Sequence, residues 1–264
     1  MRHLQCAANR CAKPSDVASG ISRCGRGWKP GARGEWAGSR FVGAQLAAPQ
    51  KDAKASCMAA RDDILGVILA GGQSRRFGGG DKGLADLAGR PVLSHIIARF
   101  HPQVGRLILS INGDARRFAC FNLPTITDQE NAGLGPLSGI LAALDWQNQH
   151  AHDCTAVATV STDVPFLPLD LIQRLDAERA DGIAIATSGG WRHPTIAIWP
   201  VTARAAIADA LQQRQLSVNA LTERLNAVAV PFAMRDIDGT AMDPFLNVNT
   251  PDDLAAARAL IGKA

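Results

Sequence analysis

This chain has 264 residues, of which 47% are hydrophobic, so it is long enough to bury the core of one α/β domain. Residues 1–60 hold ten of its 28 Lys and Arg but only three of its 24 Asp and Glu, which gives them a net charge of +7. The remaining residues have a net charge of −3, and this mildly acidic balance argues against general nucleic-acid binding. None of its six cysteines forms a C-x-x-C pair, which argues against a zinc site and a disulfide framework and favours a reduced, cytoplasmic protein. The chain also has no apolar run of roughly 18 residues, which argues against a membrane span.

The first 60 residues are rich in Gly, Ala, Ser and Arg and show neither helical nor strand periodicity. Such a composition buries too little apolar surface to offset the entropy of an ordered chain. We therefore predict a disordered basic extension over residues 1–60 and a folded domain over residues 61–264. A basic tail that contacts a partner or a membrane is the functional alternative; an unstructured extension upstream of Met58 is the simpler interpretation.

Residues 64–70 form a short apolar run with β-branched residues, which predicts a strand buried on both faces. The residues that follow combine three cations, Arg75, Arg76 and Lys82, with six glycines within residues 71–83. Glycine lets backbone N–H groups approach an anion closely, so we predict a phosphate-binding loop. The stretch matches neither the G-x-x-x-x-G-K-[ST] motif nor a G-x-G-x-x-G that directly opens a helix.

Strands and helices then alternate along the chain. Strands are predicted at residues 106–111, 123–127, 155–160, 182–187, 195–199 and 227–230, with the two that flank residues 189–190 forming a hairpin. Helices are predicted at residues 91–100, 115–120, 137–147, 169–179, 202–214 and 218–225, and a last one begins with a capping box at Thr250, Pro251 and Asp253. This alternation predicts a three-layer α/β/α, Rossmann-like fold with a mainly parallel sheet.

Polar residues follow several of the predicted strands, namely Lys82, Asn112, Asp128 and Asp163. The carboxyl ends of parallel strands converge on one crevice, so we expect these side chains to share a site. An Asp at the end of a central strand is well placed to hold Mg²⁺ beside phosphates; capping the next helix is the alternative role for Asp163. The loop at residues 131–139 opens a helix, whose free N–H groups should face the same crevice.

Four separated motifs resemble, in order, those of the molybdopterin nucleotidyltransferases, and among them the molybdenum cofactor guanylyltransferases. They are Leu-Ala-Gly-Gly-x-Ser-Arg-Arg-Phe-Gly at residues 69–78 with Asp-Lys-Gly at 81–83, Gly-Pro-Leu-Ser-Gly at 135–139, Asp-Val-Pro-Phe at 163–166 and Asn-Val-Asn-Thr-Pro-Asp-Asp-Leu at 247–254. The resemblance covers roughly residues 62–261. It implies an enzyme, a nucleotidyltransferase.

The resemblance implies transfer of GMP from GTP to the terminal phosphate of molybdopterin, or of its molybdenum-loaded form, with release of pyrophosphate. The product would be the guanine dinucleotide form of the molybdenum cofactor. GTP and molybdopterin would be the small-molecule substrates, Mg²⁺ the metal cofactor, and proteins that synthesise molybdopterin or mature molybdoenzymes the transient partners. Neither nucleic acid nor a membrane is expected as a partner.

Residue roles carry over from the family at the matching positions. Arg76, Lys82 and Asp163 would be catalytic, because the two cations neutralise the triphosphate and the leaving pyrophosphate and Asp163 holds Mg²⁺. Nucleotide binding would involve Lys82 and Asp163 together with five further residues: Leu69, Ala70, Gly71, Asn112 and Asp128. The family has a stronger Asn cluster after the second strand, so here either Asn112 or Ser110 would make that contact.

Three other functions remain open. A cytidylyltransferase for the same cofactor shares the fold but carries Leu-Ala-Ala-Gly where this chain has Leu-Ala-Gly-Gly at residues 69–72. A sugar-phosphate nucleotidyltransferase shares the chemistry, and a non-catalytic cofactor-binding or delivery module would show no turnover. The family also matches residues 192–195 near the substrate, where His193 has either a substrate-side or a structural role.

Overall fold

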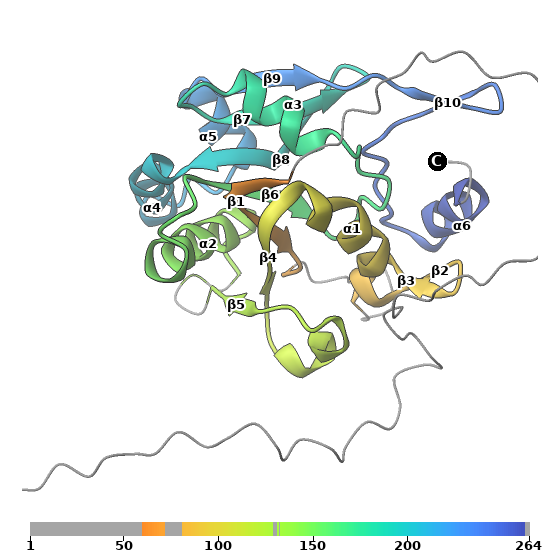
Figure 1. The fold of residues 1–264 in the computed structure, drawn as a ribbon, viewed down its shortest axis with the longest axis horizontal. Helices are drawn as coiled ribbons and strands as arrows, with labels where there is room; N and C mark the ends of the chain where they lie inside the picture. Colours follow the sequence, from red (N-terminus) through yellow and green to blue (C-terminus); the bar gives the residue numbers. More distant parts are fainter. Residues whose placement is uncertain (1–59, 72–80, 129–130, 132, 262–264) are drawn as a thin grey trace, which may run out of the picture. The chain divides into compact units, whose positions relative to one another are not determined.

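The computed structural model describes residues 60–71, 81–128, 131 and 133–261. They contain a seven-stranded sheet with the strand order β5-β4-β1-β6-β8-β7-β9 (Figure 1). β8 runs antiparallel to both of its neighbours, and the other neighbouring pairs are parallel, which confirms the predicted mainly parallel sheet. The strands are β1 (Arg61–Leu69), β4 (Val104–Ile111), β5 (Thr125–Thr127), β6 (Ala156–Ser161), β7 (Ala184–Ser188), β8 (Trp191–Pro200) and β9 (Val228–Pro231).

β1 lies inside the sheet, and its side chains alternate between two hydrophobic cores. Ile64 and Ile68 belong to one core, whereas Leu65 and Val67 belong to the other. Successive side chains of a strand point to opposite faces, so a strand covered on both sides needs an unbroken apolar run. Helices thus cover both faces of the sheet, as predicted: α1 (Val92–Phe100), α2 (Pro136–His150), α3 (Leu171–Glu178), α4 (Arg204–Gln212), α5 (Val218–Arg224) and α6 (Pro251–Leu260).

The carboxyl ends of four parallel strands are level with one another. Leu69 of β1 lies opposite Ser110 of β4 on one side and Ser161 of β6 on the other. Ile111 of β4 lies opposite Thr127 of β5. This register brings the polar residues that follow these strands to one edge of the sheet.

The hairpin predicted around residues 189–190 is formed by β7 and β8. Both of its turn residues, Gly189 and Gly190, have positive φ angles of 53° and 84°, which glycine adopts without a Cβ clash. β8 pairs antiparallel with β6, with Ala156 opposite Pro200. The amino-terminal half of β8 therefore lies at the same edge as the carboxyl ends of the parallel strands.

Two small hairpins were not predicted: β2 (Asp86–Leu87) with β3 (Arg90–Pro91), and β10 (Arg235–Ile237) with β11 (Thr240–Met242). Strands of two or three residues are too short to show an alternating pattern, so periodicity does not reveal them. The short helix expected near residues 115–120 is a 3-10 helix, η4 (Ala115–Phe121).

The capping box predicted before the last helix is confirmed. Thr250 Oγ1 accepts a hydrogen bond from the Asp253 amide at 3.1 Å, and Asp253 Oδ2 accepts one from the Thr250 amide at 2.8 Å. The disordered extension predicted over residues 1–60 falls almost entirely outside the described residues and stays a prediction.

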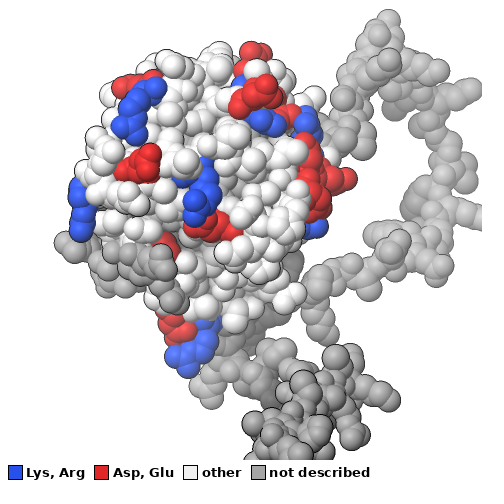
Figure 2. Space-filling view, turned by 90° about the vertical axis from the view of Figure 1, so that its left-hand side faces the viewer, with Lys and Arg blue, Asp and Glu red and all other residues white. Residues whose placement is uncertain are grey.

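The face of the molecule drawn in Figure 2 carries basic and acidic side chains interspersed with one another. Such mixing leaves that face without an extended field of one sign. Within the described part of the chain, every helix is either too short or too polar to cross a bilayer.

Candidate active site

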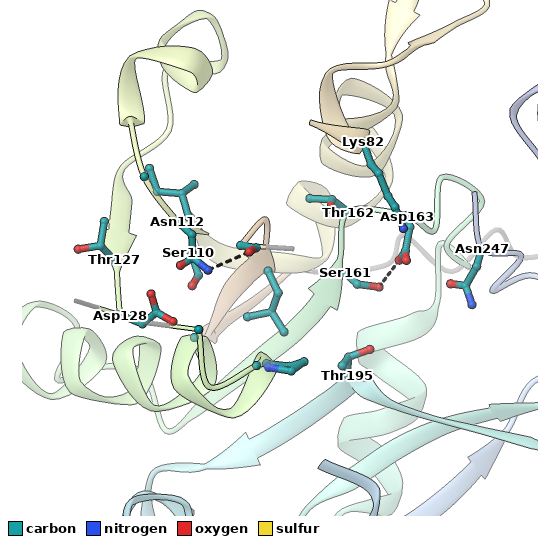
Figure 3. Close-up of a pocket in the computed structure, with 18 residues that line it drawn as sticks. Lys82, Ser110, Asn112, Thr127, Asp128, Ser161, Thr162, Asp163, Thr195 and Asn247 are labelled. Atoms are coloured by element: carbon teal, nitrogen blue, oxygen red, sulfur yellow. Dashed lines mark hydrogen bonds between the residues drawn. The ribbon is translucent and has the colours of Figure 1, made fainter. Parts of the chain in front are cut away.

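A cavity of about 1090 Å³ opens at the edge where the four parallel strands end. Its walls come from the ends of β1, β4, β5 and β6, the N-terminus of α2, and single residues from β8 and the segment before α6. In Figure 3 most of its labelled polar side chains form two groups that face each other, and Thr195 and Asn247 are labelled apart from them. We call them the β4 side (Ser110, Asn112, Thr127 and Asp128) and the β6 side (Lys82, Ser161, Thr162 and Asp163).

Asn112 ties the end of β4 to Gly71, two residues after the end of β1. Its Nδ2 donates a hydrogen bond to the Gly71 carbonyl at 2.8 Å (Figure 3). A Cβ on Gly71 would lie 2.7 Å from that nitrogen, so only glycine permits this approach. The contact fixes the direction in which the chain leaves β1.

Asp128 is held at the N-terminus of α2. The Ser138 hydroxyl, in the first turn of that helix, donates to Asp128 Oδ2 at 2.5 Å, and both side chains are buried. Gly135 precedes the helix with a φ of +86°, and Pro136 occupies its first position. Free N–H groups at this end of a 15-residue helix favour a bound anion or polar group in the cavity.

Lys82 and Asp163 dominate the β6 side. The Lys82 ammonium contacts Asn249 Oδ1, and Asp163 Oδ1 accepts a hydrogen bond from the Ser161 hydroxyl at 2.6 Å (Figure 3). The Val248 amide donates to the Asp163 carbonyl at 2.8 Å. The β6 side thus contributes one cation and one carboxylate to the lining of the cavity.

The segment that carries Asn247 and Asn249 is fixed by α6. Asp253 accepts hydrogen bonds from the amides of Asn249 and Thr250 at 2.9 and 2.8 Å. These bonds, that of Asn249 most strongly, lower the pKa of the Asp253 carboxyl. The capping box therefore also positions Asn247 at the cavity wall.

Most of the residues predicted for the site do line this one cavity: Leu69, Gly71, Lys82, Asn112, Asp128 and Asp163. Ala70 is not among the lining residues, and its amide donates to the Ser110 carbonyl at 2.7 Å. Arg76 and its neighbour Arg75 lie outside the described residues. Ser110, the alternative to Asn112, also lines the cavity.

Thr195 lines the cavity although no role was predicted for it. It reaches the site because β8 is antiparallel and enters at the carboxyl edge of its neighbour β6. The match to the family over residues 192–195 was the available signal. Asn247 was noted as unexplained by capping, and it too lines the cavity.

His193 belongs to a hydrogen-bonded group beside the cavity. The Ser188 hydroxyl lies 2.7 Å from His193 Nε2 and donates to Asp243 Oδ1 at 2.7 Å, so Nε2 of the neutral ring is the donor to Ser188. The ring packs on Phe245, with centroids 4.8 Å apart. Burial lowers the pKa of His193, and Asp243 acts in the opposite direction. Because the Ser188 hydroxyl donates to Asp243 and not to the imidazole, His193 does not activate this serine.

The chain matches the family model of the MobA-like NTP transferase domain over residues 66–228. Molybdenum cofactor guanylyltransferase of Mesorhizobium japonicum is 47% identical over 205 residues, which make up 76% of this chain and 97% of that protein.

Two solved structures share the fold. Molybdopterin-guanine dinucleotide biosynthesis protein A from Archaeoglobus fulgidus superposes with a TM-score of 0.59 at 23% identity, covering 76% of this chain and 100% of that chain. The manganese complex of Rv0371C from Mycobacterium tuberculosis has a TM-score of 0.54 at 17% identity and covers 75% of this chain and 100% of that chain. Both agree with the predicted three-layer nucleotidyltransferase architecture.

Proposed function

The chain belongs to the molybdenum cofactor guanylyltransferases, within the MobA-like NTP transferase family, and we propose that it transfers GMP from GTP to the terminal phosphate of molybdopterin or of its molybdenum-loaded form. It is a nucleotidyltransferase of molybdenum cofactor biosynthesis. The observation that best supports this reaction is the cavity at the strand ends, which is lined by Lys82, Asp128 and Asp163.

In the proposed reaction an oxygen of the molybdopterin phosphate attacks the α-phosphorus of GTP. The bond from that phosphorus to the bridging oxygen breaks, and pyrophosphate leaves with the electron pair. The attacking oxygen is already ionised near neutral pH, so no proton has to be removed during attack. The protein then needs to supply alignment and charge neutralisation.

We assign the guanosine of GTP to the β4 side. Leu69 and Gly71 line it, with Asn112 and Asp128 as its polar groups. Asn112 is our choice for the contact after β4, because Ser110 is only 4% exposed and its hydroxyl would lie 2.8 Å from a Cβ on Gly139 of α2. A serine packed this closely under a helix is suited to shape the wall and leaves Asn112 to meet the nucleotide.

We assign the phosphates to the β6 side. The Lys82 ammonium would neutralise the triphosphate and stabilise the leaving pyrophosphate, and the sequence position of Arg76 suits it to the same task. Because pyrophosphate gains charge as it leaves, a fixed cation stabilises the transition state more than the ground state.

Asp163 fits a role as ligand of Mg²⁺. It is a hard oxygen donor at the cavity wall, and Thr162 and Asn247 add further oxygen atoms to the lining. The described residues contain no cluster of three His, Cys, Asp or Glu side chains, and Mg²⁺ beside a nucleotide needs only one or two carboxylates plus the phosphates. When bound, Mg²⁺ would supply neutralisation of phosphate charge.

A four-nucleotide competition tests the proposed function. The protein is incubated with molybdopterin, a divalent cation and equal concentrations of GTP, CTP, ATP and UTP, and the dinucleotide products are separated. We expect the guanine dinucleotide to dominate. A cytosine product would identify a cytidylyltransferase, and absence of pyrophosphate release with any nucleotide would indicate a binding or delivery module. Transfer to a sugar phosphate in preference to molybdopterin would identify the third alternative.

His193→Gln is expected to keep substantial maximal turnover, because an ionised phosphate needs no general base. The Gln amide can still donate to Ser188, although acceptor binding could weaken through the link to Phe245. The measurement is kcat at saturating GTP and molybdopterin from about pH 6.5, the ordinary pKa of His, up to about pH 9. A thousandfold loss that recovers at high pH would show that a base is required.

The same variant has an expected effect on stability. Because the folded state lowers the pKa of His193 from its ordinary 6.5, the unfolded state takes up a proton first as pH falls. The wild-type protein should therefore lose stability relative to His193→Gln as pH drops below about 6.5. Denaturant unfolding at pH 7.5 and 5.5 measures this difference, and a constant difference would contradict the assigned protonation state.

We also propose a cytoplasmic location and transient contacts with proteins that make molybdopterin or mature molybdoenzymes. The proposed substrates support this, since a reactive cofactor intermediate is best passed on directly. Cross-linking in cell extract, with and without GTP, tests these contacts.

A further inference from the structure

Arg117 lies in η4, outside the lining of the cavity, yet its guanidinium contacts groups that flank the phosphate-binding residues. Its Nη1 lies 2.5 Å from Asp81 Oδ2. Its Nη2 donates to the Asn112 carbonyl at 2.7 Å, and its Nε donates to the Asp114 carbonyl at 3.1 Å. One side chain therefore joins the residue before Lys82 to the turn after β4.

That turn also holds Gly71, two residues after the end of β1. Asn112 donates to the Gly71 carbonyl, while Arg117 holds Asp81, so Gly71 and Asp81 are both anchored to the turn between β4 and η4. Gly113, within this turn, has a φ of +82°, and a Cβ there would lie 3.5 Å from Arg117 Nη2. The guanidinium is thus fitted closely against the turn.

The charge of Asp81 makes this contact consequential. Its carboxylate is 18% exposed and directly precedes Lys82, the one described cation of the β6 side. An unpaired carboxylate there would repel a triphosphate and attract the Lys82 ammonium away from it. Removing one partner of a partly buried ion pair leaves an uncompensated charge on the other partner.

We propose that Arg117 is a positioning residue for guanylyl transfer: it neutralises Asp81 and holds the Asp81–Lys82 backbone so that the Lys82 ammonium serves the phosphates of GTP. This inference rests on the proposed function, because it takes GTP as the ligand that Lys82 meets. It assigns Arg117 no contact with substrate.

Arg116 provides a matched control. It is the neighbouring residue of the same 3-10 helix, its side chain is 91% exposed, and it pairs with Asp114 at 2.9 Å. Removing it deletes the same charge at nearly the same place in the sequence, without touching Asp81 or Lys82.

The test is a double-mutant cycle on the full chain. Arg117→Ala should lower kcat/KM for GTP about ten- to thirtyfold, with KM for molybdopterin changed less than about twofold, and Arg116→Ala should stay within about twofold of wild type. Arg117→Lys should recover part of the loss. Asp81→Asn combined with Arg117→Ala should be more active than Arg117→Ala alone, because the unpaired carboxylate is gone.

A double variant no better than Arg117→Ala would overturn the proposal, and so would equal losses for Arg116→Ala and Arg117→Ala. Thermal unfolding of each variant, together with Mg²⁺-GTP titration in the absence of acceptor, separates a lost fold from lost nucleotide binding. If the nucleotide competition favours another triphosphate, the cycle is measured with that nucleotide. Coupling between Asp81 and Arg117 would then stand while the assignment of GTP fails.

Discussion

Lys82→Ala is expected to lower kcat for GMP transfer about a hundred- to thousandfold, which corresponds to about 3–4 kcal/mol of transition-state stabilisation. Lys82 is at the cavity wall on the β6 side, where the pyrophosphate would leave, and its ammonium already has a polar partner in Asn249. Because the leaving group gains negative charge, the loss should appear mainly in kcat and less in KM for GTP. Steady-state pyrophosphate release measures both constants.

Arg106→Ala is the control for this variant. Arg106 pairs with the exposed Asp153 at 2.9 Å, and it does not line the cavity. Its replacement should leave kcat within about twofold of wild type, since surface ion pairs contribute little. Turnover of Lys82→Ala close to that of the control would refute the role of Lys82, provided that both variants unfold at the same temperature as the wild-type protein.

Asp163→Ala is the second substitution with a large expected effect, a loss of kcat of about a hundred- to thousandfold. The Asp163 carboxylate lies at the end of β6, where the Ser161 hydroxyl donates a hydrogen bond to it. The Val248 amide donates to the backbone carbonyl of Asp163. The substitution removes the carboxylate and keeps that backbone contact, so the fold should persist. Activity is measured across a titration of Mg²⁺ and separately of Mn²⁺. Asp163→Ala should need a higher metal concentration than the wild-type protein to reach half of its maximal activity.

Asp145→Ala serves as the matched carboxylate control. Asp145 of α2 pairs with Arg204 of α4 at 2.5 Å, and neither residue lines the cavity. Wild-type metal dependence in Asp163→Ala would be incompatible with a metal-ligand role. A shift of the same size in Asp145→Ala would point to a general change in charge instead.

Local chemistry made most of the individual elements predictable. The run at residues 64–70 is a strand because its side chains must satisfy two cores at once, and Ile64 and Leu65 indeed enter different ones. The last helix begins where Thr250 and Asp253 cap it, since those side chains satisfy nearby backbone groups. Such contacts join residues only a few positions apart, so the sequence alone reveals them.

The candidate site was predictable to the extent that parallel strands end at one edge. Asn112, Asp128 and Asp163 each follow a strand, and the level register of β1, β4, β5 and β6 does bring them to one cavity. Ala70 was expected to offer its backbone to the nucleotide, which stays a prediction, and its amide pairs with the Ser110 carbonyl of β4. Only the extent of pairing distinguishes the last residue of a strand from the first residue of a loop.

The sequence by itself determined the family, the alternation of strands and helices, and the strand-end residues of the cavity, because these follow from local periodicity and from motifs. Tertiary structure alone decided that β8 enters antiparallel beside β6 and so brings Thr195 to the cavity. It also decided that Arg117 meets Asp81 across 36 positions of the chain. Both arrangements arise when segments far apart in the sequence pack together, and local periodicity specifies neither of them.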